Sequence, residues 1–247
     1  MRIGILEAGK MMDVVAAKHG AYLKLYTDLL HLADPEITTF GVKVVDGVMP
    51  TTTKAADGWL ISGSRNGVYD GAPWITALCG FLRACVQDGV PLVGICFGHQ
   101  LMAQAFGGQA EKSPKGWGLG VHDYTPVTPL SWAPALSQQW SGHAMHQDQV
   151  TALPQDATLL ARSDFCPNAA LAYGSLERPY ALSVQSHPEF SAGLVEDMIL
   201  HRLDGIVPAP VIAGARARSG APVDNLAWAQ TVVAFFKRHH AAKGLAA

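Results

Sequence analysis

One cysteine stands at a position where a thiol can do chemistry. The segment PLVGICFGHQ, residues 91–100, runs from a buried apolar strand into a helical pattern, so Cys96 falls on the turn between them. Gly94 and Gly98 flank this turn as glycines flank the nucleophile of a G-x-S-x-G elbow, with sulfur in place of oxygen. The free N–H groups at the start of the following helix favour a thiolate. The pattern therefore predicts a nucleophile rather than an inert core cysteine.

A thiolate nucleophile needs a base, and the segment SVQSHPEF, residues 183–190, can supply one. Its alternating pattern predicts a strand that ends just before His187, which then emerges at the strand terminus. Residues two apart in an extended chain face the same way, so Glu189 can support the ring of His187. Taken alone, this segment also fits a surface histidine beside a solvated glutamate. Together with Cys96 it predicts a nucleophile, a base and an orienting acid.

A third segment can stabilise the oxyanion that thiolate attack on a carbonyl creates. The stretch WLISGSRNGVYD, residues 59–70, places Gly63, Ser64 and Arg65 directly after a predicted strand. Their backbone N–H groups can form an anion-binding nest, with the amide of Phe97 as a second donor. An ordinary glycine turn is the alternative interpretation. In an open parallel sheet, ligands bind beyond the carboxyl ends of the strands, so all three segments can converge there.

The elements that must position these residues predict an α/β fold. Short apolar strands alternate with amphipathic helices, which favours a mostly parallel sheet with helices on both faces. After residue 109 the segments predict successive strands, and hence a small antiparallel extension. We interpret residues 205–222 as an exposed loop, and residues 1–247 as a single domain with a helical C-terminal extension from about residue 193. The predicted strands are 2–6, 37–45, 58–62, 91–95, 121–126, 157–161, 168–173 and 180–185, and the predicted helices are 21–33, 74–87, 98–106, 193–203 and 225–240.

Composition narrows the class of protein and its ligands. The 247 residues are 49% hydrophobic, with a net charge of -2 and no Lys/Arg block, which disfavours nucleic acid and membrane surfaces as partners. No apolar stretch reaches the roughly 18 residues that span a bilayer, and the first ten residues predict a strand rather than a signal peptide. We therefore expect a cytoplasmic protein with a small-molecule substrate. The four cysteines form no CxxC pair and the ten histidines lack ligand spacing, so we expect no metal and no cofactor.

The motifs GICFGHQ, SHPEF and GSRNGVYD together resemble the class I glutamine amidotransferase family, over roughly residues 4–190. The stretches KGWGLG and HQDQV are similar to those of its GMP-synthase-like branch. The resemblance implies a flavodoxin-like sheet and hydrolysis of the side-chain amide of glutamine through a γ-glutamyl thioester. It implies Cys96 as nucleophile, His187 as general base and acid, and Glu189 as the orienting acid of a Cys-His-Glu triad.

A γ-glutamyl substrate carries an α-ammonium and an α-carboxylate, so its pocket must offer partners to both. Gln100 lies on the first turn of the elbow helix, and the resemblance implies it as a substrate contact. Arg65, in the glycine loop, and His146, in HQDQV, are further candidates for substrate binding. Asp148 can face the ammonium, although a solvated turn carboxylate is an equal alternative.

Several functions stay open. Glutaminase chemistry is favoured slightly, with low basal rates unless a partner orders the loop at residues 63–65. Because no ATP-binding motif is present and we expect the domain to stand alone, ammonia would pass to a separate synthetase or acceptor subunit. A γ-glutamyl peptidase would use the same thioester on a γ-linked peptide of the glutathione type. A catalytically silent partner subunit is disfavoured because the inferred triad is complete. An α/β-hydrolase is disfavoured because the acid of that class precedes its histidine.

Overall fold

The computed structural model describes residues 1–244, and the side chains of residues 1–241. Over these residues the main sheet has nine strands, β1 (Arg2–Leu6), β2 (Thr38–Val42), β3 (Gly58–Ile61), β4 (Leu92–Ile95), β6 (Gly118–Pro126), β7 (Trp140–His146), β9 (Ala157–Arg162), β10 (Ala170–Tyr173) and β11 (Ala181–Val184). A separate antiparallel pair consists of β5 (Gln109–Lys112) and β8 (Asp148–Ala152). The helices are α1 (Asp13–His19), α2 (Tyr22–His31), α3 (Pro73–Gln87), α4 (Phe97–Ala105), α5 (Ala192–Met198), α6 (Ala209–Ala217) and α7 (Asn225–Gly244). Short turns of helix are η1 (Val44–Asp46), η2 (Thr53–Ala55), η3 (Pro134–Leu136) and the π-helical η4 (Ile199–Leu203).

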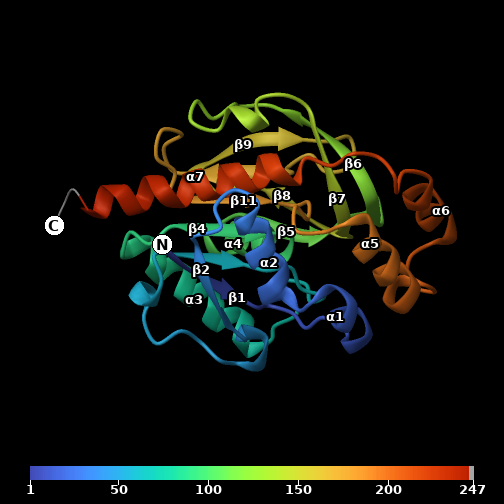
Figure 1. The fold of residues 1–247 in the computed structure, drawn as a ribbon, viewed down its shortest axis with the longest axis horizontal. Coiled ribbons are helices and arrows are strands. Elements are labelled where there is room, and N and C mark those ends of the chain that lie inside the picture. Colours follow the sequence, from blue (N-terminus) through green and yellow to red (C-terminus); the bar gives the residue numbers. More distant parts are fainter. Residues whose placement is uncertain (245–247) are drawn as a thin grey trace.

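The main sheet has a parallel half and an antiparallel half. Its strand order is β2-β1-β3-β4-β11-β10-β9-β6-β7, with parallel neighbours from β2 to β11 and antiparallel neighbours from β11 to β7. Helices α2 and α7 pack together on one face, and α3 and α4 on the other (Figure 1). The predicted α/β fold, with a flavodoxin-like parallel sheet, flanking helices and a small antiparallel sheet, is confirmed.

Two expectations about the later part of the chain are wrong. The sequence pattern predicts β11 as part of the antiparallel extension, but this strand pairs in parallel with β4. All four of its residues are buried, as a strand at the centre of a sheet with both faces covered requires. The predicted loop 205–222 contains α6, because an alanine-rich stretch follows Pro208 and packs Ile212 and Ala215 inward. The predicted helical extension continues to residue 244, and residues 245–247 lie outside the described residues.

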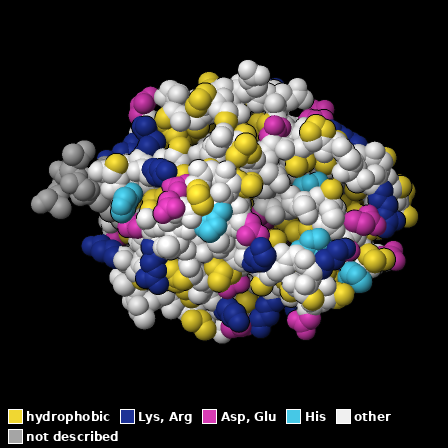
Figure 2. All heavy atoms as spheres, viewed as in Figure 1, with side chains coloured by type: hydrophobic (Ala, Val, Ile, Leu, Met, Phe, Trp, Pro, Cys, Tyr) yellow, Lys and Arg dark blue, Asp and Glu magenta, His cyan; other side chains and the backbone are white. Residues whose placement is uncertain are grey.

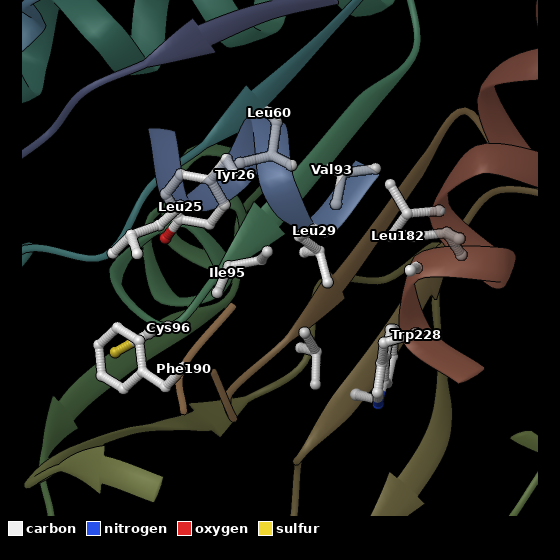
Figure 3. Packing of buried hydrophobic residues seen from close by; sticks show 14 of the residues in the cluster. Leu25, Tyr26, Leu29, Leu60, Val93, Ile95, Cys96, Leu182, Phe190 and Trp228 are labelled. Carbon is white, nitrogen blue, oxygen red and sulfur yellow. The ribbon is translucent and has the colours of Figure 1, made fainter. Parts of the chain in front are cut away.

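Successive residues of the central strands point to opposite faces and fill two cores. Leu60 and Val93 lie in the core beneath α2 and α7, whereas Ile61 and Leu92 lie in the core beneath α3 and α4. Figure 3 shows part of the first core, in which Trp228 of α7 and side chains of α2 pack over the sheet. Burial on both faces fixes the central strands, and so fixes the loops at their carboxyl ends.

The surface carries charges of both signs. Figure 2 shows Lys and Arg side chains interspersed with Asp and Glu over the face viewed, rather than gathered in one basic stripe. Across residues 1–244, no helix combines the length and the apolar composition that crossing a membrane would need.

A buried histidine ties helix α4 to the sheet. The Nε2 atom of His99 donates to the carbonyl oxygen of Asn168 at 2.9 Å, and its Nδ1 atom accepts from the Ser183 hydroxyl at 2.7 Å. Burial lowers the pKa of His99 to about 4, although the bond to Asn168 opposes that shift. The ring is therefore neutral near pH 7, the form in which one nitrogen donates and the other accepts.

We predict that His99 makes stability fall in acid. The unfolded imidazole binds a proton below about pH 6.5, whereas burial holds the pKa of folded His99 at about 4. The stability contributed by the neutral ring is complete above the unfolded pKa and is lost as the pH falls toward the folded one. Between about pH 7.5 and 5, the loss in free energy of unfolding should be about 2 kcal/mol smaller in His99→Gln than in the wild type.

Urea denaturation at both pH values measures this difference. The variant keeps part of the pH dependence, because burial also lowers the pKa values of His143 and His146 to about 4 and about 3. His201→Gln is the matched control, since that histidine is exposed, and it should retain the slope of the wild type. Equal slopes in all three proteins would contradict the prediction.

Candidate active site

Cys96 occupies a strained turn between β4 and α4. It is the one non-glycine residue with a positive φ among residues 1–244, at φ 53° and ψ -102°. Its N–H donates to the Val184 carbonyl oxygen at 2.8 Å, which holds the turn against the end of β11. Such a conformation costs free energy and persists only where the surroundings enforce it. The sequence prediction that Cys96 lies on a strand-to-helix turn agrees with this geometry.

The glycines on either side allow α4 to approach the sheet closely. A Cβ atom on Gly98 would lie 2.5 Å from the carbonyl oxygen of Ile61, and one on Gly94 would lie 2.5 Å from the carbonyl oxygen of Gly98. Both obstacles are backbone atoms, which cannot rotate away as a side chain can. The start of α4 therefore rests against the ends of β3 and β4 at a distance that only glycine permits.

His187 and Glu189 form a buried pair beyond the end of β11. The Nδ1 atom of His187 donates to Oε1 of Glu189 at 2.7 Å, and the two side chains are 4% and 0% exposed. The N–H of His187 donates to the His143 carbonyl oxygen on β7 at 2.8 Å, and its ring stacks on Phe190 with centroids 4.1 Å apart. Phe190 and Cys96 line the same cavity, and both are labelled in Figure 3. The imidazole is therefore fixed in position and in orientation.

The charges around His187 favour its protonated form. Burial lowers the pKa of His187, but the interactions with Cys96 and Glu189 outweigh burial and raise it to about 10. At neutral pH the ring is then an imidazolium between two groups that can each carry a negative charge. This is the electrostatic environment in which a cysteine acts as a thiolate nucleophile.

The glycine loop after β3 passes close to His187 and Cys96. A Cβ atom on Gly63 would lie 3.0 Å from Cε1 of His187 and 3.9 Å from Cβ of Cys96. The Gly63 N–H, predicted as an oxyanion donor, donates instead to the Tyr26 hydroxyl at 3.0 Å. That donor is therefore occupied in this conformation. The backbone N–H groups of Ser64 and Phe97 make no hydrogen bond within the described residues, so both can still receive an anion.

The predicted substrate contacts line one cavity of about 740 Å³ together with Cys96, Ser64 and His187, and these contacts are Arg65, Gln100, His146 and Asp148. This volume lies within the range of about 300–1,000 Å³ that small-molecule sites occupy. Arg65 is exposed at the cavity, with no hydrogen bond or ion pair among the described residues. The carboxylate of Asp148 accepts from the Tyr69 hydroxyl at 2.9 Å.

Gln100 and His146 have structural partners within this wall. The Nε2 atom of Gln100 donates to the carbonyl oxygen of Asp148 at 2.8 Å and to Oε1 of Gln185 at 3.1 Å. The Nδ1 atom of His146 donates to the same Asp148 carbonyl oxygen at 3.0 Å. In this conformation both side chains hold the Asp148 segment in place, and burial lowers the pKa of His146 to about 3.

Sequence reasoning missed two contributions to the site. Tyr22 lines the cavity and Tyr26 bonds to Glu189 from behind it, yet both belong to an amphipathic helix in which tyrosine is an ordinary core residue. Arg202 and Leu203, in η4, also line the cavity. No motif marks either group. Among residues 1–244, no three His, Cys, Asp or Glu side chains are grouped so as to hold a metal ion.

Comparison with known families assigns the chain to a class. Residues 27–203 match the model of the glutamine amidotransferase class-I family. The chain therefore belongs to the class I glutamine amidotransferase family, as its motifs predict. It is similar to gamma-glutamyl peptidase 5 of Arabidopsis thaliana, at 30% identity over 205 residues that cover 80% of this chain and 79% of that protein.

Two further similarities extend this comparison. One of the subunits of the glutamine-hydrolysing GMP synthase of Methanospirillum hungatei is 33% identical over 147 residues, which cover 58% of this chain and 73% of that protein. The crystal structure of a glutamine amidotransferase from Thermotoga maritima matches with a TM-score of 0.72 and 16% identity, over 97% of each chain. At that identity the structural likeness supports the fold alone.

We predict opposite effects when alanine replaces two helical glycines. Gly98→Ala should lower the free energy of unfolding by about 1–3 kcal/mol, because its Cβ would press on the Ile61 backbone. Gly80→Ala should raise it by up to about 1 kcal/mol, because Gly80 is exposed inside α3 with no atom within 4 Å of the new Cβ. Urea denaturation measures both, and a stabilised Gly98→Ala would contradict the close packing of the elbow.

Proposed function

We propose that this chain is a cysteine-dependent hydrolase of γ-glutamyl amides. The observation that carries the proposal is the strained turn of Cys96, next to the buried His187–Glu189 pair and open to the cavity. A nucleophile, a base and an orienting acid are the groups that covalent amide hydrolysis requires. We further propose residues 1–247 as one domain that acts in the cytoplasm.

In the proposed reaction, the sulfur of Cys96 attacks the δ-carbonyl carbon of the γ-glutamyl group. The backbone N–H groups of Ser64 and Phe97 stabilise the oxyanion, while Glu189 keeps the ring of His187 oriented. His187 gives its proton to the leaving nitrogen, the C–N bond breaks, and a γ-glutamyl thioester remains on Cys96. A water molecule then gives a proton to His187 and attacks the thioester, which releases glutamate and restores the thiolate.

Two residues that line the cavity, Asp148 and Arg65, suit the two charges of the glutamyl group. Asp148 can receive the α-ammonium, because its carboxylate accepts only one hydrogen bond among the described residues, from the Tyr69 hydroxyl. Arg65 can receive the α-carboxylate, because it lines the cavity and has no partner among the described residues. We propose that Gln100 and His146 act by holding the Asp148 segment in place.

The size of the cavity favours a leaving group larger than ammonia. The cavity of about 740 Å³ is lined by Arg202, Leu203 and Ile206 as well as by Cys96, so it has room for more than a glutamyl group. A γ-linked peptide places its amine portion there, whereas glutamine leaves that space to water. The similarity to a gamma-glutamyl peptidase supports the same preference. The sequence alone slightly favours glutamine, and the open cavity reverses that order.

A second candidate is glutamine hydrolysis in which ammonia passes to a partner subunit. The similarity to one of the subunits of a GMP synthase supports it. The same residues would perform the chemistry, and only the leaving group and its destination would differ.

We predict that the isolated chain cleaves γ-glutamyl-cysteinylglycine and a γ-glutamyl anilide faster than glutamine. The reason is that the larger amines fill room in the cavity that glutamine leaves to water, and they gain binding free energy there. Glutamate release under matched conditions gives kcat/KM for each substrate. Glutamine turnover that exceeds both other rates would favour the glutaminase candidate.

We also predict that Cys96→Ala abolishes turnover of every substrate that the wild type cleaves, because the covalent step loses its nucleophile. A diazo-ketone analogue of glutamine should add mass to the Cys96 peptide alone, as measured by mass spectrometry. Cys79→Ala is the control, since Cys79 lies on α3 and does not line the cavity. Turnover retained in Cys96→Ala, or label spread over the other cysteines, would contradict the assignment.

A further inference from the structure

One buried hydroxyl group joins the two halves of the candidate site. Tyr26 lies on α2 and is fully buried. Its hydroxyl donates to Oε1 of Glu189 at 2.9 Å and accepts from the Gly63 N–H at 3.0 Å. Figure 3 shows this hydroxyl directed toward the side of the core on which Cys96 lies. A single oxygen atom therefore contacts both the orienting acid and the start of the glycine loop.

The bond to Glu189 decides where its carboxylate sits. Oε1 of Glu189 accepts from both Tyr26 and Nδ1 of His187, while Oε2 is buried with no hydrogen-bond partner among the described residues. Without the Tyr26 hydroxyl, the carboxylate would keep one hydrogen bond, to the same ring that it has to orient. It could then rotate together with His187 instead of holding that ring still.

The hydrogen bond from the Gly63 N–H to the Tyr26 hydroxyl positions the glycine loop. A Cβ atom on Gly63 would lie 3.0 Å from Cε1 of His187, so Gly63 lies close to that ring, and the N–H group of the next residue, Ser64, is a free donor among the described residues. A shift of Gly63 would therefore move Ser64 relative to Cys96. Loss of the Tyr26 hydroxyl would also leave the Gly63 N–H buried without an acceptor, which costs free energy and favours such a shift.

The protonation state of Tyr26 decides which of its two hydrogen bonds it donates and which it accepts. Burial, followed by the charge on Glu189, raises the pKa of Tyr26 well above its usual value. The hydroxyl therefore keeps its proton at any pH near neutrality. Because that proton goes to the carboxylate, the oxygen lone pairs remain for the Gly63 N–H.

We propose that Tyr26 is a positioning residue that couples the orientation of the His187–Glu189 pair to the position of the glycine loop. This inference rests on the proposed function of the site. Tyr26 lies one residue before the part of the chain that matches the family model, residues 27–203. Its role follows from the two hydrogen bonds and from no motif.

Substitution of Tyr26 by phenylalanine removes both bonds and keeps the ring that packs in the core. We expect Tyr26→Phe to lower kcat about 10–100-fold and to change KM less than about threefold, because the groups that move are those that act on the reacting atoms. Tyr173→Phe is the matched control. That tyrosine is also fully buried and bonds to Ser183 at 3.3 Å, but it lies in the other core.

A double-mutant cycle separates coupling from packing. If Tyr26 acts through Glu189, the two substitutions should not be independent. The fold-loss of kcat in the double variant Tyr26→Phe, Glu189→Ala should then be about 10-fold smaller than the product of the two single fold-losses. A double variant within about twofold of that product would overturn the proposal, as would a Tyr26→Phe enzyme with the kcat of the wild type.

Two measurements test the coupling without any substrate turnover, so their results can be interpreted even if the proposed function is wrong. Alkylation of Cys96 by iodoacetamide should slow in Tyr26→Phe and not in Tyr173→Phe, because His187 is held less well beside the thiol. Amide hydrogen exchange at Gly63 should speed up in Tyr26→Phe alone. Unchanged alkylation and exchange would overturn the proposal, whereas a wild type that cleaves no γ-glutamyl amide would overturn only the proposed function.

Discussion

The backbone conformation of Cys96 is the constraint on which the candidate site depends. A positive φ at a residue with a side chain costs about 1–3 kcal/mol, and the surroundings must supply that free energy. Here the bond from Cys96 to the end of β11 holds one side of the turn, and the two bonds of His99 hold the helix that follows. Gly98 lets that helix approach β3 closely enough for these bonds to form. Strain at one residue is therefore balanced by contacts with three neighbouring strands and loops.

The direction of β11 determines which groups meet Cys96. Because β3, β4 and β11 are adjacent and parallel, their carboxyl ends lie at one edge of the sheet. The loops that leave this edge carry Gly63, Cys96 and His187. Had β11 run antiparallel to β4, His187 would leave the opposite edge, on the order of 15 Å away for strands of this length. The parallel pairing of two segments almost ninety residues apart thus assembles the candidate site.

Local signals in the sequence predicted more of this arrangement than long-range ones did. The turn at Cys96 was predictable because two glycines and a change from strand to helix periodicity are features of one short segment. The direction of β11 was not predictable, since it depends on pairing with a distant strand that leaves no mark in either segment. The role of Tyr26 was hidden because its hydroxyl acts through tertiary contacts, and the same contacts occupy the Gly63 N–H. Helix α6 was mistaken for a loop because glycine and proline around it outweighed its alanines.

The walls of the cavity differ in how they are joined to the central sheet. One wall, at Asp148, is bonded to Gln100 on the elbow helix, so it moves with the nucleophile. The other wall comes from η4 and the residues after it, where the side chain of Arg202 makes no hydrogen bond or ion pair among the described residues. The Arg202 side chain can therefore change without breaking a hydrogen bond to the reacting groups, whereas Leu203 packs in the same core as Cys96. In evolutionary terms, a side chain such as that of Arg202 can vary while the residues around Cys96 stay under separate selection.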